Sequence, residues 1–305
     1  MVNPTLPSDR QRFIGGSEIA AVMGLSRWST PLHVWGIKTG KIQPTDLSDN
    51  EAVQLGIELE DFVARKFSRQ ANLKVRVDNR SFAHDKYPYL VGHIDRRVEG
   101  GEILECKTCS AWKAKEWDGE EIPIEYIYQL MWYMGLTGSK RGYIACLIGG
   151  QKFVWKPMDF NQALYDRMVA SAVDFWENYV LTDVPPMAIG GDSDTLNALY
   201  PMSEEQVVKF TGDDALLVDS LIEERDAGKR MISDANEDLE KIEVQLKQKL
   251  GAAERGETDQ YWYTWKTQQR KEYTVKASTS RVFKTIKPKG EHNGLKMQAQ
   301  EDGSR

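Results

Sequence analysis

The amino-acid sequence predicts a mixed α/β fold, a central sheet covered by helices, on three observations. Residues 51–71 repeat apolar side chains at the three- and four-residue spacing of a helix. Residues 73–108 contain short runs in which apolar and polar side chains alternate, as they do in strands. Residues 124–180 then have the patterns of an apolar helix, two strands and an amphipathic helix. Helices and strands that alternate in this order build one layered core.

Short helices are predicted near the N-terminus. FIGGSEIAAVMG, residues 13–24, has a glycine pair, then Ser17 as the helix N-cap, and Gly24 where the helix ends. A second short helix follows Pro31. The longer helix over residues 51–71 has an apolar stripe, formed by Leu59, Phe62, Val63 and Phe67.

The strands of the predicted sheet come in two groups. The first group has the sequences LKVRV, RSFAH, YLVGHIDRRV and EILECKT, and the last two flank Gly100 and Gly101 as a hairpin. Pro123 then opens the apolar helix IEYIYQLMWYMGL, because proline suits the first turn of a helix. The second group, RGYIACLIG and KFVWKPM, precedes the amphipathic helix ALYDRMVASAVDFWENYV.

The composition changes toward turn residues around Pro185 and Pro186, and we place the end of the core there. The expected organisation is a core over residues 1–190, a C-terminal extension over 191–287 and a flexible tail over 288–305. Within the extension we expect a capping box at Ser203 and Gln206, a long helix over 213–250, and a hairpin of YWYTWKTQQRKEYTVKA with RVFKTI. The long helix carries a seam with helix-pairing spacing, namely Ile232, Ala235, Leu239, Ile242 and Leu246.

Composition also limits the class of protein. A hydrophobic content of 41% over 305 residues is typical of a folded protein. Three cysteines cannot all pair with one another, and no charged stub followed by an apolar segment opens the sequence. No run approaches the roughly 18 apolar residues of a membrane span. We therefore expect a cytoplasmic protein with no disulfide framework and no membrane partner.

The net charge of −6 argues against a protein that coats nucleic acid without specificity, because phosphate binding normally shows as a basic excess. The basic residues are nevertheless unevenly distributed. Nine of them crowd one stretch: Lys74, Arg76, Arg80, Lys86, Arg96, Arg97, Lys107, Lys113 and Lys115. A local nucleic-acid site is compatible with this distribution.

The predicted hairpin carries the candidate chemistry. Glu105 and Lys107 are two residues apart on a strand and share one face. A two-residue loop would put Asp95 on the opposite face, whereas a three-residue loop over residues 99–101 would set Asp95 directly across from Glu105. Glycine at the last loop position favours the three-residue loop.

Two carboxylates about 5 Å apart repel by roughly 3 kcal/mol at an effective dielectric near 20, so they need a cation, a shared proton or contact with water. Mg²⁺, or Mn²⁺ in its place, would satisfy both and would bind phosphate oxygens in turn. Lys107 could then orient or help deprotonate an attacking water and offset developing charge. The plainer alternative is a solvated pair of Glu105 and Lys107, with Asp95 closing a turn.

Other side chains add weight to the site. Gln129 and Tyr133 lie four residues apart, on one face of the helix that follows the hairpin, where glutamine is unusual as core packing. Glu60 falls beside the apolar stripe of its helix, and a carboxylate aimed at the core needs a partner such as a metal. Alternatively, the Glu60 side chain lies at the edge of the apolar stripe and its carboxylate reaches solvent.

These residues carry a family resemblance. Asp95, the Glu105-Cys106-Lys107 run and QLMWY, residues 129–133, resemble the PD-(D/E)xK nuclease signature with the Q-x-x-x-Y motif of its helicase-associated and phage exonuclease branches. IGGSEIAAVMGLS, LGIELEDFV and VGHIDRRV resemble more narrowly the YqaJ-like viral recombinases, the family that includes phage lambda exonuclease. The resemblance covers roughly residues 10 to 180, and the motifs occur in the family's order. It implies a restriction-endonuclease-like core, a central mixed sheet flanked by helices.

The resemblance also implies roles for single residues. Asp95, Glu105, the Cys106 carbonyl and Glu60 would bind the metal, and Lys107 would serve the attacking water. Gln129 would line the catalytic site, and Tyr133 would contact the DNA. Arg10 aligns with an arginine that in this family grips the 5′-phosphate of the DNA end, with Ser17 beside it. Arg12 is an alternative to Arg10.

The function implied is a Mg²⁺-dependent exonuclease that degrades one strand of linear double-stranded DNA from 5′ to 3′. The remaining 3′ single-stranded tail would pass to a phage annealing protein for recombination, and relatives assemble as a ring-shaped homotrimer. Two alternatives stay open: an endonuclease of the same superfamily, and a DNA-binding scaffold without catalysis. Cys106 and Cys109 form a C-x-x-C, but an iron–sulfur cluster needs four thiolates and the chain has three cysteines.

Overall fold

The computed structural model describes residues 11–272, 274, 281, 283 and 284. The chain divides into two compact units, residues 1–201 and 202–305. The domain bounds expected from composition stay a prediction.

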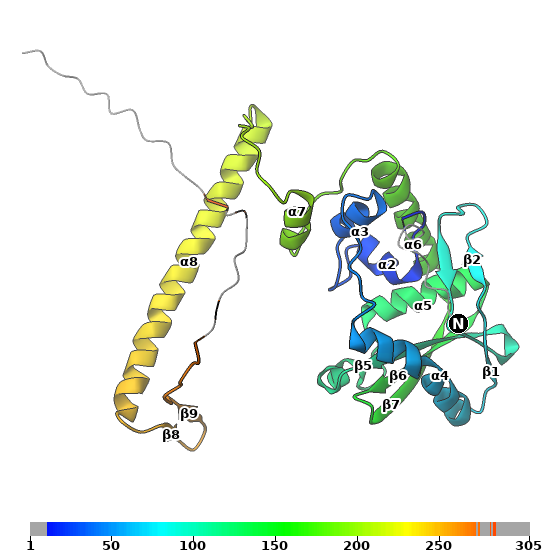
Figure 1. Ribbon diagram of the computed structural model, residues 1–305, viewed down its shortest axis with the longest axis horizontal. Coiled ribbons are helices and arrows are strands. Elements are labelled where there is room, and N and C mark those ends of the chain that lie inside the picture. The colour runs from blue at the N-terminus through cyan, green and yellow to red at the C-terminus, as the bar shows by residue number, and fades with distance from the viewer. Residues whose placement is uncertain (1–10, 273, 275–280, 282, 285–305) are drawn as a thin grey trace, which may run out of the picture. The chain divides into compact units, whose positions relative to one another are not determined.

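The first unit contains a five-stranded sheet in the order β1-β4-β5-β6-β7. Strands β5 and β6 run parallel and the other neighbours are antiparallel, which makes the sheet mixed (Figure 1). The bounds are β1 Val75–Val77, β4 Arg96–Val98, β5 Ile103–Cys109, β6 Arg141–Ile148 and β7 Lys152–Asp159. Since β5 and β6 are parallel, the chain must cross over between them, and a helix makes this crossover.

The predicted strand over residues 89–98 is broken in two. Its first part, β3 (Val91–His93), pairs with β2 (Ser81–Ala83) in a separate two-stranded sheet, while its second part is β4. The reason is that the two parts bind different partners: β4 lies between β1 and β5, whereas the Val91 carbonyl accepts a hydrogen bond from Trp132 Nε1 at 2.9 Å. The break falls at Ile94 and Asp95.

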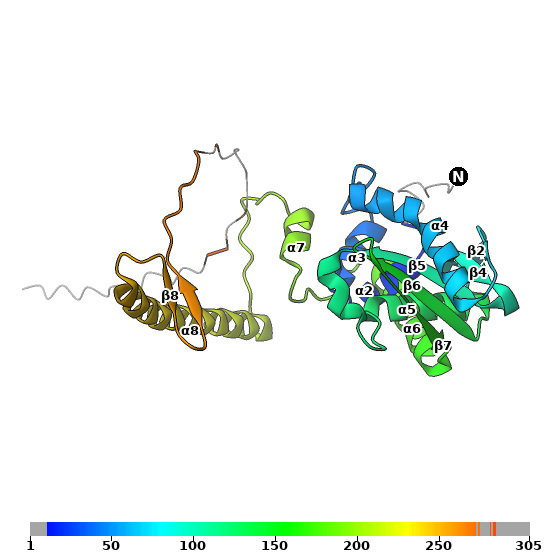
Figure 2. The same cartoon turned by 90° about the horizontal axis from the view of Figure 1, so that it is seen from below.

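Helices cover both faces of the sheet, as Figure 2 shows. On one face, Val63, Ala64 and Phe67 of α4 (Glu51–Ala71) pack against Leu104 and Tyr143. The other face holds the larger core, to which α2, α5 and α6 contribute. The remaining bounds are α2 Gly16–Val22, α3 Pro31–Lys38, α5 Ile124–Thr137, α6 Gln162–Phe175 and α7 Ser193–Leu199, with single turns or short helices η1 Glu99–Gly101, η2 Ala111–Trp117 and η3 Trp176–Val180.

The predicted N-cap of the first helix is wrong. Helix α2 begins at Gly16 with Gly15 as its N-cap, so Ser17 is its second residue. The Glu18 carboxylate takes the capping role, because its Oε2 accepts a hydrogen bond from the Gly15 amide at 3.0 Å.

Among its described residues, the second unit contains α8 (Asp213–Leu250) and the hairpin of β8 (Arg255–Glu257) and β9 (Trp262–Thr264). The long helix is confirmed over its full predicted range, but the capping box at Ser203 is wrong, since Gly212 is the N-cap of α8. Strand β9 pairs with the preceding strand β8, whereas the predicted hairpin paired this segment with the later sequence RVFKTI. Part of that predicted hairpin lies outside the described residues.

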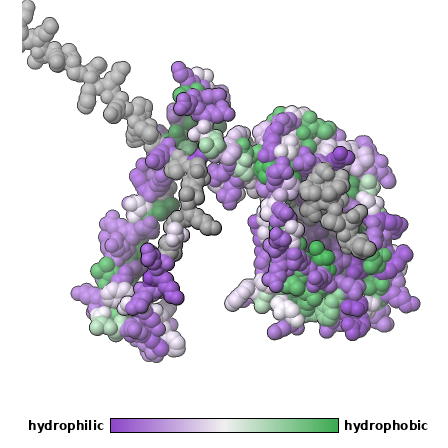
Figure 3. Space-filling view, viewed as in Figure 1, coloured by the Kyte–Doolittle hydropathy of each residue, from purple (hydrophilic) through white to green (hydrophobic). Residues whose placement is uncertain are grey.

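No residue of α8 is buried within its unit. Four of the five seam residues, Ile232, Leu239, Ile242 and Leu246, expose between 44% and 64% of their surface. Figure 3 shows hydrophobic side chains among hydrophilic ones on this unit. Among the helices that the structure describes, none is long and apolar enough to cross a membrane.

Candidate functional site

The candidate site is built on the hairpin of β4 and β5. Residues 99–101 form one tight turn, and the Val98 amide donates to the Glu102 carbonyl at 2.8 Å. The strands pair Arg97 with Ile103 and Arg96 with Leu104. The turn requires glycine, because Gly100 and Gly101 have φ of +87° and +93°.

Extending this register by one residue sets Asp95 across from Glu105. The favoured three-residue loop is therefore confirmed, and the two-residue loop is excluded. One end of the hairpin thus carries both carboxylates and the other end carries the glycine turn.

Hydrogen bonds fix these side chains. Asp95 Oδ2 accepts from the Cys106 amide at 2.7 Å, and Glu105 Oε1 accepts from Lys107 Nζ at 2.7 Å. Glu105 is only 3% exposed, and its Oε2 has no hydrogen-bond partner among the described residues. A buried carboxylate oxygen without a partner is costly unless a ligand completes it.

The electrostatics of the site leave a surplus of negative charge. Desolvation raises the pKa of Asp95 well above its usual value, and the neighbouring Glu105 carboxylate raises it further. Burial also raises the pKa of Glu105, against the opposing effect of Lys107. Burial would lower the pKa of Lys107, but the charges of Glu105 and Asp95 outweigh it and raise that pKa, so Lys107 is held as an ammonium. One ammonium balances one of the two carboxylates.

This arrangement fits a hydrated hard cation. Two carboxylates, one with an unpartnered oxygen, are the kind of ligands that Mg²⁺ or Mn²⁺ takes from a protein while it keeps several waters. Over residues 11–272 and the few described beyond them, no three His, Cys, Asp or Glu side chains come together as a ligand cluster. The protein would thus supply two carboxylates, and water, backbone oxygen or substrate phosphate the rest.

Glu60 lies beside this pair with a partner of its own. Its carboxylate forms an ion pair with Arg96, whose Nη1 also donates to the Asp95 carbonyl at 2.8 Å. The Glu60 charge contributes to the raised pKa of both Asp95 and Glu105, so it is close in electrostatic terms. Sequence reasoning missed Arg96 as a site residue, because its partner Glu60 lies on a helix 36 residues away in the chain.

Gln129 and Tyr133 of α5 are both buried, and Gln129 Nε2 donates to the Tyr133 hydroxyl at 3.1 Å. Burial raises the pKa of Tyr133, and the Glu105 charge raises it further, so the hydroxyl stays protonated. Glycine makes room for this ring: a Cβ on Gly16 would lie 2.4 Å from Tyr133 Cε1, and one on Gly92 2.9 Å from its Cδ1.

An aromatic group missed by the sequence reasoning lies on the other side of Lys107. The Lys107 ammonium is 5.0 Å from the centre of the Tyr126 ring. That ring is in turn 5.7 Å from the rings of Trp28 and of Trp117. Tyr126 precedes Gln129 by three residues on α5, and this helical spacing could have pointed to it.

The proposed phosphate-gripping residues are placed only in part. Ser17 and Arg12 are exposed at the start of the first unit, whereas Arg10 lies outside the described residues. The choice between Arg10 and Arg12 stays open.

Residues 8–140 match the YqaJ-like viral recombinase domain. The chain is 35% identical over 264 residues to the protein YqaJ of Bacillus subtilis (strain 168), a match that covers 85% of this chain and 81% of the relative.

Among solved structures, an alkaline exonuclease (LHK-Exo) from Laribacter hongkongensis has a TM-score of 0.50 at 17% identity, covering 58% of this chain and 92% of that one. The same exonuclease in complex with dAMP matches equally well. This likeness confirms the predicted fold, a central mixed sheet flanked by helices.

Proposed function

Because the chain belongs to the YqaJ-like viral recombinase family, we propose that it is a nuclease whose active site is the end of the β4–β5 hairpin. The observation that carries this proposal is the assembly of Asp95, Glu105 and Lys107, with a buried carboxylate oxygen that no described residue satisfies. The likeness of fold to an alkaline exonuclease supports it.

The finer proposal is a phage-type exonuclease that degrades one strand of linear double-stranded DNA from 5′ to 3′. LHK-Exo has been solved with dAMP, and a mononucleotide is what an exonuclease releases. The single-stranded 3′ tail would go to an annealing protein, and the active assembly would be a homotrimer in the cytoplasm. Arg10 or Arg12, with Ser17, would hold the 5′-phosphate at the DNA end.

Asp95 and Glu105 would hold Mg²⁺, with Mn²⁺ as a substitute, and the Cys106 carbonyl would add a backbone ligand. Glu60 would join this ligand set by exchanging its ion pair with Arg96 for the cation. When bound, the cation would supply Lewis-acid polarisation of the scissile phosphate. Lys107, kept as an ammonium by Glu105, offsets the negative charge that develops on the phosphate and orients the attacking water. Gln129, fixed by its hydrogen bond to Tyr133, offers its amide oxygen to a donor in the site.

The test uses a linear duplex labelled at the 5′-phosphate, incubated with the wild-type protein or Lys107→Ala in Mg²⁺ or EDTA. Labelled mononucleotide should appear only with the wild type in Mg²⁺. Lys115→Ala is the matched control, because Lys115 is an exposed lysine outside the site and should leave release unchanged. Undiminished release by Lys107→Ala would remove the mechanism.

A closed circular duplex separates an exonuclease from an endonuclease. The wild type should leave it intact, since it offers no end. For the phosphate grip, Arg10→Ala and Arg12→Ala should be compared on duplexes with and without a 5′-phosphate. The variant that loses the preference for phosphate identifies the gripping residue, and retention of the preference by both would contradict the assignment.

A further inference from the structure

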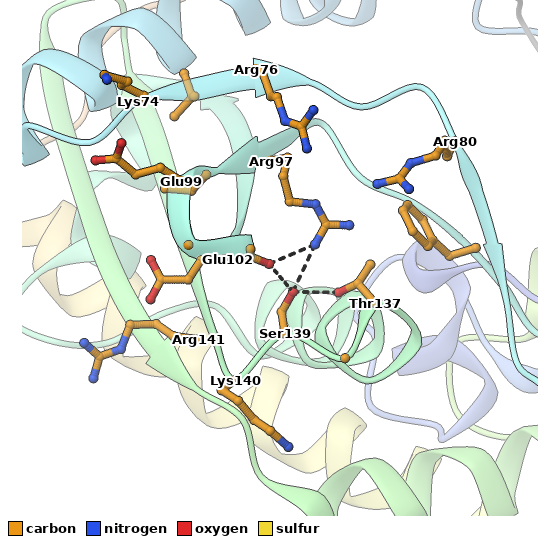
Figure 4. Close-up of a pocket in the computed structure, with 16 residues that line it drawn as sticks. Lys74, Arg76, Arg80, Arg97, Glu99, Glu102, Thr137, Ser139, Lys140 and Arg141 are labelled. Atoms are coloured by element: carbon orange, nitrogen blue, oxygen red, sulfur yellow. Dashed lines mark hydrogen bonds between the residues drawn. The ribbon is translucent and has the colours of Figure 1, made fainter.

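A pocket lies at the turn end of the same hairpin, away from Asp95 and Glu105. It has a volume of about 760 Å³ and lies between β1, the hairpin turn and the end of α5. Figure 4 shows the guanidinium groups of Arg76, Arg80 and Arg97 turned toward the same part of it. We call it the basic pocket and define it by Lys74, Arg76, Arg80, Phe82, Arg97 and Lys140.

The basic pocket contains an unfavourable pairing of like charges. Arg76 on β1 lies directly opposite Arg97 on β4. Like charges in directly opposed positions destabilise a sheet. Arg97 is buried, and its guanidinium binds Asp78, the Gly101 carbonyl and the Ser139 hydroxyl. These hydrogen bonds explain why Arg97 is an arginine. They do not explain why the residue opposite Arg97, Arg76, is an arginine too.

Carboxylates compensate only part of this charge. Asp78 binds both Arg80, at 2.7 Å, and Arg97, at 3.3 Å, so one carboxylate serves two guanidinium groups. Over the described residues, Arg76, Lys74 and Lys140 form no ion pair. Two more carboxylates, Glu99 and Glu102, line the pocket, but its lining holds six cations, namely Lys74, Arg76, Arg80, Arg97, Lys140 and Arg141. In a chain with a net charge of −6, the pocket therefore has a local excess of positive charge.

An aromatic ring lies among the guanidinium groups. The centroid of the Phe82 ring is 5.1 Å from the Arg80 guanidinium carbon and 5.4 Å from that of Arg97. Phe82 is only half-buried. Cations along a groove with an aromatic side chain are the combination that holds single-stranded nucleic acid, through phosphate contacts and base stacking.

We propose that the basic pocket binds the phosphodiester backbone of single-stranded DNA, the strand that the nuclease leaves uncut. This proposal rests on the proposed function for the origin of that strand. Glu105 lies four residues from Gly101 on the extended β5 side of the hairpin, about 13 Å at the usual strand rise. Bound DNA could therefore reach from the catalytic end of the hairpin to its turn.

The experiment measures binding of a labelled single-stranded oligonucleotide to the full-length protein by fluorescence anisotropy, in EDTA and over a range of salt concentrations. Arg76→Ala should weaken binding by about fivefold and reduce the salt slope of log K by about 0.7, the value for one lost phosphate contact on a single strand. The double variant Lys74→Ala/Arg76→Ala should lose about twice that slope. Arg167→Ala, at an exposed arginine of α6, is the matched control and should bind like the wild type.

Folding of the variant is checked by its melting temperature. Because Arg76→Ala removes a like-charge pair, its Tm should be no lower than that of the wild type. Unchanged affinity and salt slope in both pocket variants would overturn the proposal. The proposal would also be overturned if the pocket variants lost affinity for polyglutamate, an acidic polypeptide, but kept their affinity for the oligonucleotide. That result would instead indicate an acidic protein partner.

The same variants separate this proposal from the proposed function. If the wild type degrades duplex DNA while Arg76→Ala retains full oligonucleotide affinity, the pocket assignment alone fails. If oligonucleotide binding depends on Arg76 but the wild type releases no nucleotide in Mg²⁺, the proposed function fails and the pocket remains a single-strand site.

Discussion

At the scale of single residues, Asp95 and Glu105 face each other. The ammonium group of Lys107 beside them balances the charge of only one of these two carboxylates. The structure keeps this repulsion although a neutral pair would fold at lower cost. Asp95→Asn should therefore raise the free energy of unfolding by roughly 1 kcal/mol in the absence of divalent metal while abolishing DNA cleavage. Chemical denaturation in EDTA measures it. A large loss of stability would mean that Asp95 is a structural anchor rather than a functional one.

Asp78 is the residue whose loss should harm the fold. It is buried and holds both Arg80 and Arg97, and the hydrogen bond from Arg80 lowers its pKa below the usual value. Its folded-state pKa lies below its unfolded one, so its stabilisation is present above about pH 4 and is lost as pH falls through the folded value. Asp78→Asn should lower the free energy of unfolding by about 2 kcal/mol at pH 7.

The difference in the free energy of unfolding between Asp78→Asn and the wild type should be smaller at pH 3 than at pH 7. Urea unfolding at both pH values measures it. Asp118→Asn, which removes an exposed carboxylate, serves as the control and should change little at either pH. A difference that stays the same at pH 3 would contradict the role given to the ionised carboxylate.

Much of the site at this scale could be predicted from local sequence. The spacing of Glu105 and Lys107 and the two glycines of the turn are enough to bring Asp95, Glu105 and Lys107 together. The ion pair of Glu60 with Arg96 could not be predicted, because it joins a helix to a strand 36 residues away. The opposition of Arg76 and Arg97 likewise depends on β1 choosing β4 as its partner.

At the scale of elements, the approach of α2 to α5 depends on Gly16. A Cβ there would lie 2.4 Å from Cε1 of Tyr133, whose ring fills the space between the two helices. Gly16→Ala should lower the free energy of unfolding by about 1–3 kcal/mol, as overpacking does, and should reduce activity by displacing Tyr133. Thermal melting and cleavage assays check this. Gly190→Ala is the control, since a Cβ at that position meets nothing within 4 Å. Equal melting temperatures for the two variants would contradict the packing argument.

The long helices were the most predictable elements. Helix α4 spans the predicted residues 51–71, with Asn50 as its N-cap in the structure, and α8 spans its predicted range. Local cap signals were less reliable: Ser17 and Ser203 have capping chemistry, but Glu18 caps α2 and Gly212 precedes α8. The strand over residues 89–98 was predicted as one because alternation shows which face a residue takes and not which strand it pairs with.

At the scale of the whole molecule, the proposed homotrimer predicts a mass. The chain weighs 34.8 kDa, so the assembly should sediment at three times 34.8 kDa, about 104 kDa. Analytical ultracentrifugation at several protein concentrations decides this. A species of 34.8 kDa at every concentration would contradict the trimer and leave the catalytic assignment untouched.

The central claim is that Asp95 and Glu105 together hold a divalent cation, and electron paramagnetic resonance of Mn²⁺ tests it without DNA. The wild type should bind Mn²⁺ with a signal that both Asp95→Asn and Glu105→Gln lose. Lys107→Ala should keep it, because removing the ammonium frees Glu105 Oε1 and leaves both carboxylates in place. Mn²⁺ binding of wild-type strength in Asp95→Asn and Glu105→Gln would contradict the account.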